Sequence, residues 1–130
     1  MNDDVSTGQS EIQVLAERAF ATIPKEFRDQ LRDVVIQVVD LPDEETCHDL
    51  DLESPLDLLG LYRGVPLDER SVLDVPQHMD TIFLYRLSLL RYAQDTGEDL
   101  YNLVHHVLVH EIGHHYGFSD AEMEAIESER

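Results

Sequence analysis

The segment His110-Glu111-Ile112-Gly113-His114 constrains the fold more than any other part of the chain. Side chains four residues apart lie on one face of an α-helix, so a helix here would bring His110 and His114 to one metal ion. Glu111 would then lie beside the metal, where its carboxylate could take a proton from a metal-bound water without being a ligand. The pattern therefore predicts a helical metal site that contains its own general base.

Gly117 and Asp120 extend this pattern to H-E-x-x-H-x-x-G-x-x-D. Gly117 can adopt the positive φ that ends a helix sharply, and the chain would then return with Asp120 as a third, anionic ligand. Three protein ligands leave one tetrahedral position open, as a catalytic zinc requires. A second interpretation stays open, because Ser119 or Asp120 could instead cap a following helix over residues 121–127.

Apolar residues at spacings of three and four lead into the motif and predict a long helix that packs on a core. The residues at these spacings, which include the polar Glu111 and His115, are Leu100, Leu103, Val104, Val107, Leu108, Glu111, Ile112 and His115. We expect Asp95 or Thr96 to begin the helix. His106 shares the histidine face and could support the site or contact a substrate, although a solvated histidine is the simpler interpretation. His105 and His115 do not lie on the face of His110 and His114 and are left out of the predicted site.

The rest of the chain predicts further short helices and three strands. The helices are expected over residues 11–22, 25–31 and 87–93, the strands over 33–40, 58–62 and 80–85, and loops or turns over 40–55 and 63–77. This order predicts an α+β fold, in which a small mixed sheet packs with helices and the active-site helix lies near the carboxyl terminus. Residues 1–10 are expected to form a disordered lead-in and residues 11–130 a single domain.

The strand predicted just before the helix over residues 87–93 has two interpretations. Thr81 to Tyr85 could be an edge strand that pairs with an extended substrate backbone, or a buried strand of the core. Tyr85 or Arg86 could stabilise the oxyanion formed during hydrolysis. Core packing of Tyr85 and a surface ion pair of Arg86 are the alternatives.

The formal net charge of −19 argues against a nucleic-acid-binding surface and against attraction to anionic membranes. An acidic solvated surface is the simpler interpretation, and steering of basic peptides is the alternative. The single cysteine, Cys47, permits no internal disulfide. Because the first residues do not resemble a signal peptide and no apolar run is long enough to span a membrane, we expect a cytoplasmic protein.

From about Ile12 to Ala125, the chain resembles the minimal, single-domain zincin-like metallopeptidase family of bacteria. The blocks that carry the resemblance are IPKEF at 23–27, LGLYRGVPL at 59–67, IFLYR at 82–86 and VHEIGHHYGFSD at 109–120. The resemblance implies a zincin-like fold, with His110, His114 and Asp120 as ligands of Zn²⁺ and Glu111 as the general base. It also implies a peptide or protein substrate.

The sequence thus predicts a zinc-dependent hydrolase, in particular a metallopeptidase. Two histidines and one carboxylate also describe the iron site of non-haem oxygenases, but those enzymes have no need of Glu111. A non-catalytic metal-binding or interaction protein that retains the fold is the second alternative, since a chain of 130 residues leaves little protein to build a substrate cleft. The oligomeric state is not set by the sequence, and a monomer is the starting expectation.

Overall fold

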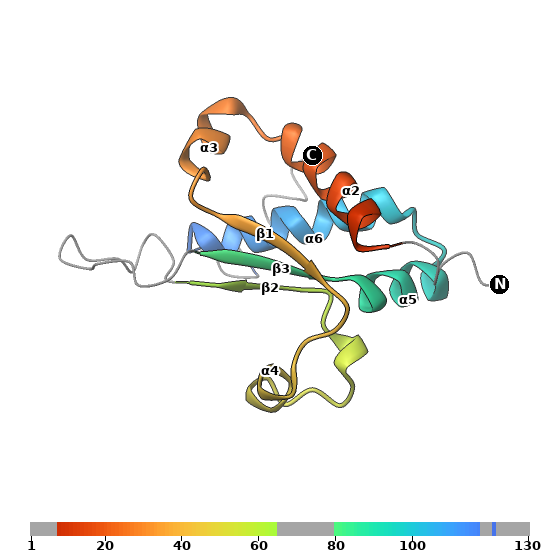
Figure 1. Cartoon of the computed structure of the whole chain (residues 1–130). Helices are drawn as coiled ribbons and strands as arrows, with labels where there is room; N and C mark the ends of the chain where they lie inside the picture. Colours follow the sequence, from red (N-terminus) through yellow and green to blue (C-terminus); the bar gives the residue numbers. More distant parts are fainter. Residues whose placement is uncertain (1–7, 65–79, 118–120, 122–130) are drawn as a thin grey trace.

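The computed structural model describes residues 8–64, 80–117 and 121, and its elements form an α+β fold (Figure 1). In chain order these elements are α2 (Gln9–Ala21), α3 (Lys25–Gln30), β1 (Val35–Val39), α4 (Glu44–Asp49), the 3-10 helix η1 (Pro55–Asp57), β2 (Gly60–Arg63), β3 (Thr81–Tyr85), α5 (Arg86–Thr96) and α6 (Leu100–His115). The three strands form one mixed sheet in the order β1-β3-β2. The predicted fold class, with its small mixed sheet and a carboxyl-terminal site helix, is confirmed.

Strand β3 lies in the middle of this sheet. It pairs in parallel with β1, where Val35 is opposite Thr81, and antiparallel with β2, where Gly60 is opposite Leu84. The interpretation of Thr81–Tyr85 as an edge strand is therefore wrong, because both of its sides are hydrogen-bonded to neighbouring strands. Ile82 and Leu84 are fully buried, so β3 is the core strand that the alternative interpretation described.

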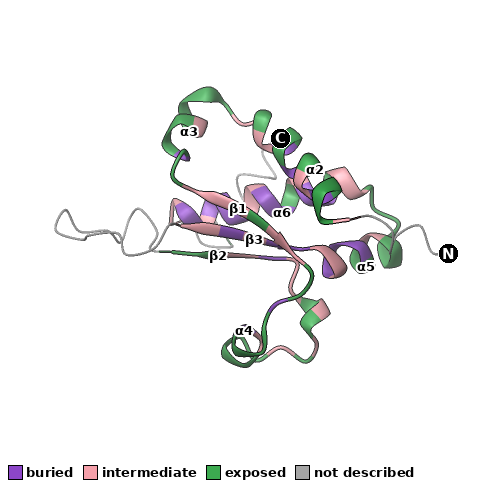
Figure 2. Cartoon of the chain, in the orientation of Figure 1, coloured by how far each residue is buried: buried purple, intermediate pink, exposed green. Residues whose placement is uncertain are grey.

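The core lies between the sheet and the helices α2, α5 and α6. Helix α6 runs behind the strands, and α2 contacts both α6 and β1 (Figure 1). Fully buried apolar side chains come from all of these parts, among them Ile12, Ala16, Ala19, Ile82, Leu84, Leu89, Val104 and Leu108. Figure 2 shows the buried segments on the sides of α2, α6, β3 and α5 that face one another. The burial of this apolar surface is the main force that holds α6 against the sheet.

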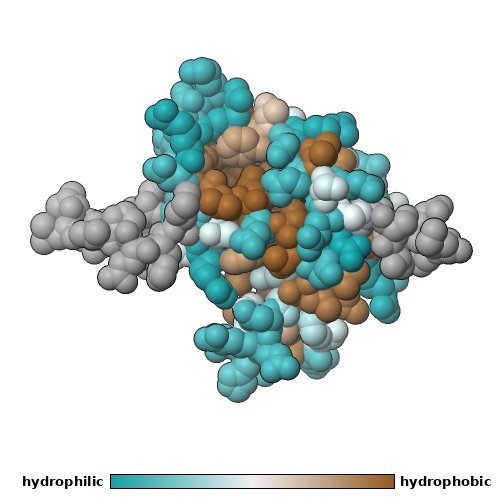
Figure 3. Space-filling view, viewed as in Figure 1, coloured by the Kyte–Doolittle hydropathy of each residue, from teal (hydrophilic) through white to brown (hydrophobic). Residues whose placement is uncertain are grey.

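Helices α3 and α4 project from this core. Helix α3 has no buried residue, and Thr46 is the buried residue of α4. In Figure 3, hydrophilic side chains cover both helices, and a hydrophobic area over the strands lies between them. These two helices therefore depend on polar contacts more than on burial.

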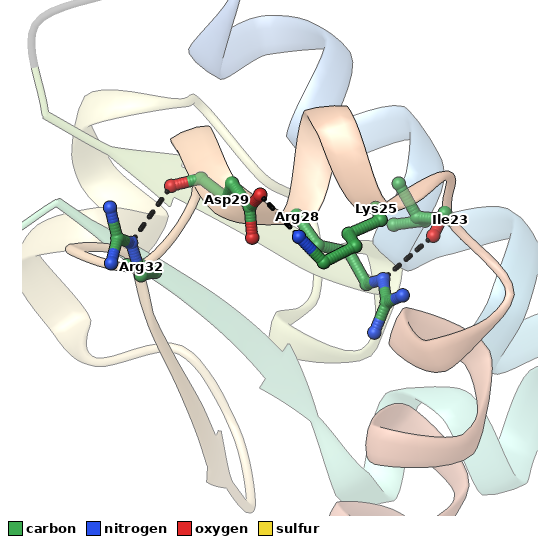
Figure 4. Close-up of polar contacts among 5 residues, drawn as sticks. All are labelled: Ile23, Lys25, Arg28, Asp29 and Arg32. Atoms are coloured by element: carbon green, nitrogen blue, oxygen red, sulfur yellow. Dashed lines mark hydrogen bonds and ion pairs between the residues drawn. The ribbon is translucent and has the colours of Figure 1, made fainter.

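Polar contacts within and beside α3 are drawn in Figure 4. The Nζ of Lys25 lies 3.2 Å from the Oδ2 of Asp29, one turn away. Arg28 Nε donates to the carbonyl oxygen of Ile23 at 2.9 Å, and Arg32 Nε donates to that of Asp29 at 3.1 Å. The ion pair is exposed and is worth less than about 1 kcal/mol. The bonds to carbonyls fix the direction in which the chain enters and leaves α3.

Helix α4 falls in a segment that we predicted to be a loop. Its sequence has no apolar periodicity, and its start is set by a cap instead: the side chain of Asp43 accepts a hydrogen bond from the backbone of Thr46 at 2.8 Å. Arg63 then donates to the hydroxyl of Thr46 at 3.1 Å and links α4 to the end of β2. The capping bond of Asp43 and the contact from Arg63 thus stabilise α4, which has no apolar periodicity from which a helix could be predicted.

Other boundaries moved by a few residues. Helix α2 begins at Gln9, before the predicted start, and α5 continues to Thr96 and ends at Gly97 with a φ of 75°. Helix α6 therefore begins later than predicted, after the cap residue Asp99. Residues 65–79, Asp120 and the predicted helix over 121–127 (except Ala121) lie outside the described residues. Among the residues that are described, no helix is long and apolar enough to cross a membrane.

Candidate metal centre

Helix α6 is built to hold a polar motif at its carboxyl end. The carboxylate of Asp99 accepts a hydrogen bond from the backbone of Asn102 at 3.0 Å and caps the first turn. At the other end, the backbone N–H of Gly117 donates to the carbonyl of His114, and Gly117 has the predicted positive φ, at 87°. Between these ends the apolar face packs on the sheet, so the opposite face can carry the histidines.

His110, Glu111 and His114 form a compact group on α6. One ligand atom from each lies within 4.8 Å of the others, which is close enough to hold one metal ion. The two imidazole rings are 4.8 Å apart between centroids and nearly perpendicular, at 80°. Both histidines are half-buried, whereas Glu111 is only 8% exposed. Two imidazoles are donors that zinc accepts, and a carboxylate beside them is placed where it could take a proton from a metal-bound water, so the group is chemically suited to a zinc site.

Strand β2 approaches α6 very closely beside Glu111. A Cβ atom placed on Gly60 would lie 2.7 Å from Cγ1 of Val107, 3.1 Å from the carbonyl oxygen of Phe83 and 3.5 Å from Cγ of Glu111. Only a glycine leaves room for this packing. The contact places one face of β2 at Gly60 directly against the turn of α6 that carries Glu111.

The other histidines of α6 have different surroundings. The ring of His106 is exposed and stacks against that of His110 at 6.3 Å. Nε2 of His105 lies 3.0 Å from the hydroxyl of Thr22, at the end of α2. His106 therefore belongs to the histidine face of α6, as its spacing predicted, while His105 connects α6 to α2.

His115 makes polar contacts that the sequence analysis missed. Its Nδ1 lies 3.0 Å from the hydroxyl of Tyr62 and 3.4 Å from Oδ2 of Asp80, and the residue is only 2% exposed. The available signal was its spacing: His115 follows Leu108 and Ile112 on the apolar face of α6. A histidine at a core position predicts a buried polar partner, because a buried imidazole without one is costly.

Tyr85 and Arg86 have the structural partners that we gave as alternatives to catalysis. Nε of Arg86 lies 2.7 Å from Oδ1 of Asp40, and this guanidinium lowers the pKa of the Asp40 carboxyl below its ordinary value. Tyr85 is 3% exposed, and burial raises the pKa of its hydroxyl to about 12. The ion pair joins the end of β1 to the start of α5, and Tyr85 packs as a core residue.

Comparison with known proteins agrees with this geometry. The model of the zincin-like metallopeptidase family matches residues 31–130, which include the whole sheet, α5 and α6. A search of curated proteins gives no match. Because the family model covers most of the chain and includes the His110-Glu111-His114 group, this protein belongs to the zincin-like metallopeptidase family.

Proposed function

We propose that this protein is a zinc-dependent metallopeptidase in which Glu111 is the general base. The observation that carries the proposal is the gathering of His110, Glu111 and His114 within 4.8 Å on one helix. Membership of the family supports the same chemistry. We further propose that the catalytic unit is the single domain of residues 11–130.

The roles of the residues follow from their chemistry. His110 and His114 would bind zinc through imidazole nitrogens, with Asp120 as the third ligand; for Asp120, which lies outside the described residues, the support is the motif alone. Bound zinc would polarise the scissile carbonyl and lower the pKa of a water. Glu111 would accept a proton from the attacking water and then donate it to the leaving amine. Glu111 is buried beside Gly60, and this packing would restrict its side chain during both transfers.

Strand β2 is the proposed binding edge for the substrate backbone. Within the described part of the chain β1 and β2 are the two edge strands of the sheet, and β2 is the one that packs against α6 at Gly60, beside Glu111. An extended peptide that pairs with this edge would be recognised through its main chain, with little demand on its side chains. This proposal replaces β3 by β2 in the role that the sequence analysis considered for an edge strand.

The substitution Glu111→Gln tests the proposed function. The amide is nearly isosteric but cannot accept a proton, so zinc content should persist while peptide hydrolysis falls by about two to four orders of magnitude. Zinc is measured by elemental analysis of protein prepared without an affinity tag, and hydrolysis is measured on a library of unstructured peptides. Glu98→Gln, an exposed change just before α6, is the matched control and should alter neither quantity.

The outcomes separate the candidate functions. A wild-type protein that binds zinc stoichiometrically but cleaves no peptide in the library would favour the non-catalytic metal-binding alternative. Equal hydrolysis by the wild type and Glu111→Gln would remove Glu111 from the mechanism.

A further inference from the structure

The last turn of α6 carries two neighbouring histidines with different surroundings. His114 is half-buried and lies with His110 and Glu111, whereas His115 is 2% exposed. Successive residues of an α-helix point about 100° apart around its axis. A contact that fixes the direction of His115 therefore also fixes the direction of His114.

His115 is held by two residues that are distant in the sequence. Tyr62 comes from β2, where it pairs with Ile82, and its hydroxyl lies 3.0 Å from Nδ1 of His115. Asp80 directly precedes β3, and its Oδ2 lies 3.4 Å from the same nitrogen. The carbonyl of Asp80 also accepts a hydrogen bond from the backbone of Val35 at 2.9 Å, which fixes its position against β1. The two partners thus belong to the sheet, and they tie the end of α6 to it.

The packing around these partners is tight. A Cβ atom on Gly64 would overlap the carboxylate of Asp80 and would lie 2.7 Å from the hydroxyl of Tyr62. The rings of Tyr62 and His115 meet edge to face at 5.4 Å. Such close contacts leave the imidazole of His115 little freedom to rotate.

The end of a helix is where it frays first, because its last carbonyls have no partner within the helix. In α6 this end carries His114. We infer that His115, Tyr62 and Asp80 are positioning residues, which hold the last turn of α6 so that His114 stays with His110 and Glu111. The inference rests on the proposed function in that His114 is taken to be a metal ligand. The three residues act through His114 and are not themselves in the proposed reaction.

Hydrogen exchange in the metal-free protein tests the anchor independently of zinc. Tyr62→Phe deletes the hydroxyl that contacts His115, and Thr22→Val deletes the hydroxyl that contacts His105 on the same helix. We expect Tyr62→Phe to speed exchange at the amides of Tyr116 and Gly117 about three- to tenfold relative to that of Val104. Thr22→Val should leave this ratio unchanged. An unchanged ratio in a folded Tyr62→Phe protein overturns the inference.

Zinc affinity then tests whether the anchor positions His114. At a temperature where all variants are folded, Tyr62→Phe should bind zinc about ten- to a hundredfold more weakly in competition with a chelator, and Thr22→Val should bind it like the wild type. The visible spectrum of the cobalt(II)-substituted Tyr62→Phe protein should also differ from that of the wild type. A loss of stability alone would not cause such a change in the spectrum. If Tyr62→Phe does not fold, Asp80→Asn is compared with Asp80→Ala. The asparagine variant should then retain more zinc affinity than the alanine variant.

These results distinguish two kinds of failure. If the wild type binds no zinc, the proposed function falls, and the exchange experiment still decides whether the anchor exists. If the wild type binds zinc and Tyr62→Phe binds it equally well with an unchanged cobalt spectrum, the proposed function stands and the positioning role is wrong.

Discussion

The two faces of α6 use the same residue type for different purposes. On one face, His106, His110 and His114 are exposed or half-buried and lie close enough to stack or to share an ion. On the other, His115 is buried with polar partners from the sheet, among apolar residues such as Leu108. The difference teaches that histidines on one helix can have opposite surroundings, so that the partners of each histidine must be known before a role is assigned to it.

The largest expected effect concerns the face of α6 that carries His106, His110 and His114. His110→Ala removes one proposed ligand, so zinc affinity should fall by more than the roughly hundredfold that the loss of a supporting residue costs. The unfolding free energy of the metal-free protein should change by less than about 1 kcal/mol, because the residue is half-buried and outside the core. Chelator competition and urea unfolding measure the two quantities.

His106→Ala is the matched control for this prediction, since it removes a histidine from the same face one turn earlier. We expect it to retain zinc affinity within about threefold. If both variants lose zinc affinity equally, the metal lies nearer to the amino end of α6 than proposed, and His106 belongs to the metal site.

The second largest effect concerns the face of α6 that packs in the core. Leu108 is fully buried, and Leu108→Ala should lower the unfolding free energy by about 2–5 kcal/mol through lost burial and a residual cavity. Urea unfolding of the metal-free protein measures this loss. Zinc affinity of the folded fraction should stay near that of the wild type. A variant that loses zinc affinity while keeping its stability would show that the two faces are not separable.

The smallest effect concerns an exposed ion pair and sharpens the contrast with the buried contacts of His115. Asp40 lies on the surface, and the neighbouring Arg86 lowers the pKa of its carboxyl below the ordinary 3.8. A lowered pKa in the folded state adds stability above the unfolded pKa, and this stability is lost as the pH falls through the folded pKa. Asp40→Asn should therefore cost less than about 1 kcal/mol at pH 7, and nothing at a pH below the folded pKa.

Urea unfolding of both proteins between neutral and acidic pH tests this prediction. The difference between wild type and Asp40→Asn should shrink as the pH drops below the ordinary carboxylate range. A difference that instead grows on acidification would contradict the sign of the pKa shift.

The sequence predicted those parts of the fold whose causes are local. The periodicity of α6 and the β-branched run of β1 each carry their own signal, and both elements appear close to the predicted residues. Helix α4 was missed because its cause is a cap at Asp43 and not a buried face. The place of β3 was left open between an edge strand and a core strand, because the order of strands depends on pairings that no local pattern encodes.

The candidate site divides in the same way. His110, Glu111 and His114 are close in sequence, so helical spacing alone predicted that they meet. The contact between His115 and Tyr62 joins residues 53 positions apart, and only the folded chain brings them together. Sequence reasoning thus found the residues proposed for the chemistry and missed those proposed to hold them.

Helix α2 has a consequence for how this protein should be divided experimentally. The family match begins at residue 31, yet Ile12, Ala16 and Ala19 of α2 are fully buried in the core that α6 completes. A chain cut at the boundary of the match would expose the apolar surface that these residues cover. The shared ancestry of a segment and its ability to fold alone are different properties. For this chain, the helix that completes the core begins more than twenty residues before the part by which the family is recognised.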